Sequence, residues 1–126
     1  MRTALAENEE GDVASRLSYA LLGLGQHADA RTAAERALEL SPDDVLVLVT
    51  AGRSRIATGA PADAIEPLRK ALAIRPGHVH ADYHLARALA LTGDADGART
   101  HLARATAGTP RLAAQARQDE TLASLA

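Results

Sequence analysis

The chain has no cysteine, tryptophan or phenylalanine, and only two of its 126 residues are tyrosine. Without cysteine it can form no disulfide and has no thiol nucleophile, and this composition suits a reducing compartment, so we expect a cytoplasmic protein. Few bulky aromatic side chains are available to fill a compact globular core. Because 47% of the residues are nevertheless hydrophobic, we expect the apolar side chains to be buried in another kind of architecture.

Long apolar runs and a basic excess are also missing. The longest all-apolar run is 45–49, far shorter than the roughly 20 residues of a membrane-spanning helix. Residues 1–10 are polar and acidic, without the apolar stretch of a secretory signal. The net charge is −2, with −5 in residues 1–50 and +3 in residues 51–110. We therefore expect neither membrane nor nucleic acid as a partner.

A frame of two alanines between a glycine and a proline occurs three times at a period of 34 residues. Its copies are Gly25, Ala30, Ala37, Pro42; Gly59, Ala64, Ala71, Pro76; and Gly93, Ala98, Ala105, Pro110. In each copy the glycine follows an apolar stretch, where a helix end often needs a left-handed residue. The two alanines lie seven residues apart, and therefore on one helix face. The proline follows where it cannot continue that helix.

This spacing resembles the tetratricopeptide repeat (TPR), in which a helix, a tight turn and a second antiparallel helix form each unit. The resemblance covers residues 11–112. It implies an all-α fold, a right-handed superhelical solenoid whose repeats bury their apolar faces on one another. The expected parts are an N-terminal arm or short helix (1–10), three repeats (11–44, 45–78 and 79–112) and a C-terminal capping helix (113–126).

Some residues depart from the pattern. Arg55 and Asp82 take places that are usually apolar in this family. Pro67 falls inside a predicted helix and would remove the hydrogen bond to the Asp63 carbonyl, so we expect a local bend there. The run 45–49, VLVLV, is typical of a strand when taken alone, but the 34-residue register predicts a helix.

Four residues of one short stretch, His78, His80, Asp82 and His84, are candidates for metal binding. His80 and His84 are four residues apart on one predicted helix face, a spacing that can chelate a transition metal. No third ligand stands at a motif spacing. We therefore expect solvated histidines, no metal site and no cofactor, and we expect His101 to lie on the surface as well.

No catalytic constellation is recognisable either. The sequence lacks a phosphate-binding glycine loop, a nucleophile elbow and a zinc-knuckle spacing, and most glycines are explained by the repeat period. We therefore predict no catalytic residue and a protein that is not an enzyme.

The resemblance also implies a binding surface, because the first helix of each TPR lines a concave groove that usually receives a peptide or an extended segment. The groove residues implied here are Tyr19, Leu46, Val49, Arg53, Ile56, His80, Tyr83 and Arg87. Tyr19, Arg53 and Arg87 are 34 residues apart and should lie side by side, and tyrosine and arginine are frequent interface anchors. We therefore expect a protein-interaction module or scaffold that binds an acidic–hydrophobic protein segment.

Other functions stay open at this point. Some TPR domains hold chaperone C-termini with a clamp of lysine, asparagine and arginine. The corresponding places hold other residue types, so that ligand is not expected; they are Ser15, Tyr19, Thr50, His80 and His84. The alternatives are a structural solenoid that associates with itself, a TPR accessory domain of a longer enzyme, and an enzyme or metal protein built around the histidines.

Overall fold

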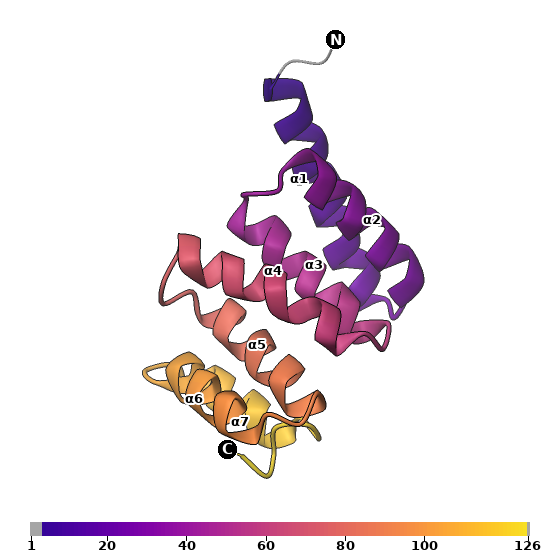
Figure 1. Cartoon of the computed structure of the whole chain (residues 1–126). Helices are drawn as coiled ribbons and strands as arrows, with labels where there is room; N and C mark the ends of the chain where they lie inside the picture. Colours follow the sequence, from indigo (N-terminus) through magenta and orange to yellow (C-terminus); the bar gives the residue numbers. More distant parts are fainter. Residues whose placement is uncertain (1–3, 126) are drawn as a thin grey trace.

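The structure is a computed structural model that describes residues 4–125, except for the side chains of 4, 5, 7 and 8. Within that part the chain forms helices joined by short turns (Figure 1). The helices are α1 (Ala4–Gly23), α2 (His27–Leu40), α3 (Val45–Ala57), α4 (Pro61–Ile74), α5 (Val79–Leu91), α6 (Ala95–Thr106) and α7 (Pro110–Gln118). Figure 1 shows α1–α6 in successive pairs, with α1 and α7 at opposite ends of the molecule.

The helices form two layers. Helices α1, α3 and α5 each pack against the even-numbered helix that follows, and α7 packs against α6. Helix α1 also contacts α3, which contacts α5. No two even-numbered helices of the described chain contact each other. Helices α1, α3 and α5 therefore form the inner, more closely spaced layer of a curved stack. The surface of this layer that faces away from the even-numbered helices is called the inner face below.

The repeated frame has the structure that its spacing predicts. Gly25, Gly59 and Gly93 have φ values of 77°, 83° and 93°, in the left-handed region that favours glycine. All six frame alanines are fully buried, so the helices of each pair approach closely over small side chains. Gly52 extends this packing, because a Cβ added there would lie 2.6 Å from Cγ of Leu68.

The strand-like run 45–49 is helical, as the repeat register predicts. It opens α3, and Asp44 caps that helix by accepting hydrogen bonds from the backbone N–H groups of Leu46 (2.9 Å) and Val47 (3.3 Å). Satisfying these orphan donors favours a helix start at this point. Tertiary context thus overrides the β-propensity of the valines.

Both ends differ from the expected parts. Helix α1 begins at Ala4 and runs through Gly11 and Asp12, so the described residues of the expected arm are its first turns; residues 1–3 lie outside the described part. Gly11 is tolerated inside the helix because the Ser41 side chain occupies the place of a Cβ. The boundaries of the repeats remain predictions.

The expected capping helix is shorter and begins earlier than predicted. Helix α7 begins at Pro110, where proline suits the first helical position. It ends at Gln118, and residues 119–125 form turns. We call these residues the C-terminal turn segment.

Candidate functional site

The clearest pairing on the inner face joins α1 to α3. Cζ of Arg53 lies 5.0 Å from the centroid of the Tyr19 ring. The two residues are one repeat period apart, so the adjacency predicted from their spacing is confirmed. A cation–π contact of this kind contributes about 0.5–1 kcal/mol at an exposed site. It holds an aromatic ring and a cation together on the surface, where 60% of Tyr19 is exposed.

An apolar hollow of about 290 Å³ lies beside this pair, between α1 and α3. Its lining residues are Ser15, Arg16, Tyr19, Leu46 and Thr50. The polar groups of the lining are partly satisfied, because the Thr50 hydroxyl donates to the Leu46 carbonyl at 2.8 Å and the Ser15 hydroxyl donates to Thr50 Oγ1 at 3.4 Å. Leu46 is 56% exposed. The hollow therefore offers an accessible apolar surface.

Arg16 lines this hollow, and Arg53 lies over its Tyr19 ring. No carboxylate lies within ion-pair distance of Arg16 or Arg53 among the side chains that the structure describes. Sequence reasoning missed Arg16. Its signal was the 34-residue register, which places it in the same position as Thr50 and His84.

Three of the predicted groove residues are buried, which corrects the prediction for them. Val49, Ile56 and Tyr83 are 4%, 6% and 1% exposed. Val49 and Ile56 pack in the core cluster that α3 shares with α4 and α5. Tyr83 packs in a second cluster, against Leu112 of α7 and Leu122 of the C-terminal turn segment. Val49 and Ile56 therefore support the inner face from below, whereas Tyr83 is buried by its packing with Leu112 and Leu122.

In the third repeat the arginine of the predicted groove, Arg87, is already paired with a carboxylate. Nε of Arg87 lies 3.0 Å from Oδ2 of Asp119, an ion pair that lacks hydrogen-bond alignment. Burial raises the pKa of the Tyr83 hydroxyl, and the nearby Asp119 charge raises it further. The accessible part of the predicted groove therefore comprises Tyr19, Leu46 and His80, which are exposed, and Arg53, which is half-buried.

The histidines of α5 are not the solvated pair that we expected. His84 is only 6% exposed. Its pKa is lowered well below 6.5, first by burial and then by the charges of Arg53, Arg87 and His80. His78 caps α5, because its Nδ1 accepts a hydrogen bond from the Ala81 backbone N–H at 3.2 Å. Burial therefore keeps the His84 imidazole neutral, close to the charges of Arg53 and Arg87.

His101 also has a structural role instead of lying on the surface. Its Nδ1 lies 2.8 Å from Oδ1 of Asp82, which is 2% exposed. Asp82, a polar residue in a place that is usually apolar, thus has a hydrogen-bonding partner on α6. In the described part of the chain, no three His, Cys, Asp or Glu side chains gather closely enough to hold a metal ion.

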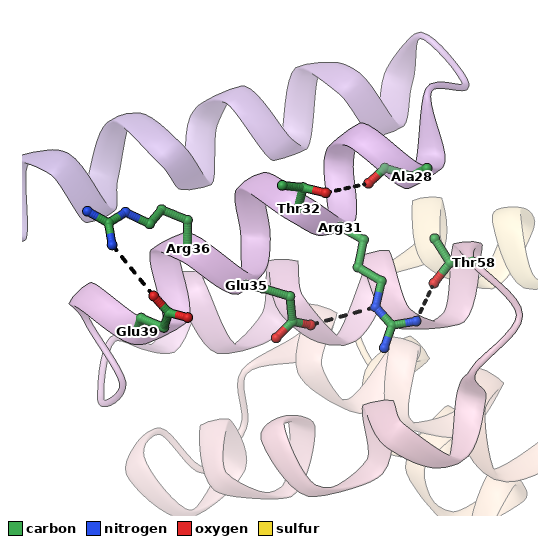
Figure 2. Close-up of a pocket in the computed structure, with 7 residues that line it drawn as sticks. All are labelled: Ala28, Arg31, Thr32, Glu35, Arg36, Glu39 and Thr58. Atoms are coloured by element: carbon green, nitrogen blue, oxygen red, sulfur yellow. Dashed lines mark hydrogen bonds and ion pairs between the residues drawn. The ribbon is translucent and has the colours of Figure 1, made fainter.

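A second hollow lies on the outer surface of α2 (Figure 2), and its charged groups are paired with one another. Arg31 lies 3.8 Å from Glu35 and donates to the Thr58 hydroxyl at 3.0 Å. Both Glu35 oxygens also accept hydrogen bonds from Arg55, each at 2.8 Å, and this lowers the pKa of Glu35. Because these groups neutralise one another, this hollow is a weaker candidate for a charged ligand than the inner face.

Comparison with known families identifies the repeats. Two profiles, both described as tetratricopeptide repeat, match residues 15–79 and 55–125. The chain belongs to the TPR family, and its fold is the all-α TPR-type solenoid that the repeat frame predicts. Family membership supports a role in protein–protein interaction.

Individual relatives agree with this fold. The chain is 38% identical over 99 residues to the probable biofilm formation methyltransferase WspC of Pseudomonas aeruginosa, but it spans only 22% of that protein's length. The Yersinia enterocolitica type III secretion chaperone SycD, in complex with a peptide of the translocator YopD, superposes with a TM-score of 0.73 at 19% identity. That match covers 90% of each chain.

YrrB, described as a TPR protein with an unusual peptide-binding site, superposes with a TM-score of 0.74 at 25% identity. This match covers 86% of the present chain and 57% of YrrB. Within residues 4–125, none of the helices combines the length and the apolar character that a membrane-spanning segment requires.

Proposed function

We propose that the inner face of α1 and α3 binds an acidic–hydrophobic segment of a partner protein. The observation that carries this proposal is the arrangement of Arg16 and Arg53. Arg16 lines the apolar hollow together with Tyr19 and Leu46, Arg53 lies over the Tyr19 ring, and neither arginine has a carboxylate partner among the described side chains. The protein acts by binding, and no catalytic step is proposed.

The apolar part of the ligand would be a single large side chain. Tyr19 and Leu46 are both more than half exposed, and the hollow between their helices is open to solvent. Burying a leucine-sized side chain there contributes about 1.5–3 kcal/mol. A segment that offers one such residue would therefore find its main apolar contact at the hollow.

The acidic part of the ligand would pair with the arginines. A guanidinium presents a fork of donors that matches a carboxylate with two parallel hydrogen bonds. Exposed charges of this kind steer association and are screened by salt over about 10 Å at 0.1 M. Binding should accordingly be of modest affinity and should weaken as the salt concentration rises.

The relatives support the class of ligand. SycD is seen with a bound peptide of YopD, and YrrB is described by its peptide-binding site. The present chain superposes on both over more than four fifths of its length. A peptide segment is therefore a ligand that proteins of this shape accept, and the arginines give its expected chemistry here.

Selection from a displayed library of random peptides, about twelve residues long, tests this proposal. We expect the wild-type protein to enrich peptides that combine Asp or Glu with a large aliphatic residue. Arg53→Glu should lose the enrichment, whereas Arg69→Glu, at an exposed arginine of α4, should keep it. Enrichment of basic peptides, or equal enrichment by both variants, would contradict the proposal.

A further inference from the structure

We propose that Tyr83, His84 and Arg87 form a second peptide-binding site of the inner face, and that the C-terminal turn segment occupies it as an intramolecular ligand. This inference rests on the proposed function in treating the inner face as a peptide-binding surface. It extends that surface to the third repeat. The ion pair between Asp119 and Arg87 also indicates the chemistry of the ligand that this site would bind.

The carboxylate of Asp119 is the acidic element of this internal ligand. Its Oδ2 lies 3.0 Å from Nε of Arg87, and its Oδ1 accepts the backbone N–H of Thr121 at 2.9 Å. The ion pair is partly shielded from water, because the two side chains are only 28% and 18% exposed. Arg87 stands one repeat period after Arg53. The arginine at this register position is therefore paired with a carboxylate in the third repeat (Arg87) and lacks such a partner in the second (Arg53).

Leu122 is the apolar element. It is fully buried and packs in one cluster with Tyr83, Ala86 and Leu102. A carboxylate and a leucine three residues further on thus lie against α5 together. This is the combination of charge and apolar contact that Arg53, Tyr19 and Leu46 present without a ligand.

Some polar groups of the site remain unused. Nδ1 of His84 and Nε of Arg87 are buried and have no aligned hydrogen-bond partner within the described chain. Buried polar groups without partners are rare and destabilising. A peptide that adds a polar group at this position would satisfy atoms that the internal segment leaves unpaired, and so would compete with it.

The internal segment is connected in a way that lets it leave. Its backbone hydrogen bonds run within the segment or to the end of α7, from Asp119 N to Gln115 O and from Ala123 N to Asp119 O. None of those found in residues 4–125 reaches α5 or α6. Release therefore breaks one ion pair and exposes Leu122 and the partly buried Leu125, without breaking a helix pair. While the segment is in place, a partner is confined to the first two repeats.

The test uses the full chain, labelled with ¹⁵N, and a synthetic peptide of residues 117–126. Asp119→Asn should release the segment, which increases amide hydrogen exchange in 119–125 and shifts the Arg87 Nε–H resonance. Adding the peptide should return that resonance toward its wild-type position. The wild-type protein should not respond at the same peptide concentration. Glu120→Gln, at the neighbouring exposed acid, should behave as wild type.

If Asp119→Asn alone leaves exchange in 119–125 unchanged, Leu122→Ala is added to release the segment. A released segment whose peptide then fails to move the Arg87 resonance overturns the inference. An equal response in the Asp119→Asn, Arg87→Gln double variant, read from the amides of α5, also overturns it. This test uses no external partner. Its result therefore does not depend on whether the proposed function at Arg16 and Arg53 is correct.

Discussion

Nη1 of Arg55 donates a hydrogen bond to the backbone carbonyl of Asp63 at 2.9 Å. This is the carbonyl that Pro67, which has no N–H, leaves without its helical donor. Arg55 stands in the place that Leu21 and Leu89 occupy in the other repeats. The arginine that breaks the apolar pattern of α3 therefore compensates the proline that interrupts the hydrogen bonds of α4.

Replacing this arginine by the residue of the other repeats should destabilise the protein. Arg55→Leu removes the donors of both the Asp63 carbonyl and the Glu35 carboxylate, at a cost of about 1–2 kcal/mol because both acceptors are partly exposed. Urea unfolding measures the loss. Adding Pro67→Ala restores a backbone N–H to Asp63 and should recover part of it. Additive effects of the two changes would contradict this relationship.

Stability should fall as the pH drops below 6.5, the ordinary pKa of histidine. The lowered pKa keeps native His84 neutral, while the unfolded chain takes up a proton, so the unfolded state binds more protons and gains in relative stability. We expect His84→Gln to flatten the pH dependence of the unfolding free energy between roughly pH 7 and pH 5.

His27→Gln, at an exposed histidine of α2, is the matched control and should retain the slope. Burial also lowers the pKa of His78, so this residue contributes in the same direction and is present in both variants. An identical slope in both variants would show that burial of His84 does not govern the acid sensitivity.

Gly52→Ala should destabilise the second repeat. The new Cβ would lie within 3.0 Å of three Leu68 side-chain carbons, and overpacking of this kind costs about 1–3 kcal/mol. Gly23→Ala is the control, since nothing lies within 4 Å of a Cβ there. It should be neutral or stabilising, because alanine is the better helix former. Equal unfolding midpoints for the two variants would mean that Leu68 does not pack against Gly52.

The repeat frame made most of the fold predictable. Turn glycines and buried alanines recur because each repeat places them in the same environment, so their spacing carries the information. The same register predicted a helix at 45–49 and the adjacency of Tyr19 and Arg53. These features depend on residues within one repeat or its immediate neighbour.

The missed features depend on contacts that the frame does not describe. Burial of Tyr83 comes from Leu112 and Leu122, which have no counterpart in the other repeats. The pairing of Asp82 with His101 joins a departure from the pattern to a residue that we expected on the surface, and neither residue indicates the other by itself. Such compensating contacts are decided by packing in three dimensions, which the period alone does not describe.

The central claim is that the inner face of α1 and α3 is the binding surface. Titrating a selected acidic–hydrophobic peptide into ¹⁵N-labelled protein, and mapping the amide shift changes, tests it most directly. We predict the largest changes around Arg16, Tyr19 and Arg53, together with an affinity that Arg53→Glu weakens by about 2 kcal/mol, or roughly 30-fold. Changes centred instead on Arg31 and Glu35 of the outer surface, with Arg53→Glu binding as wild type, would contradict it.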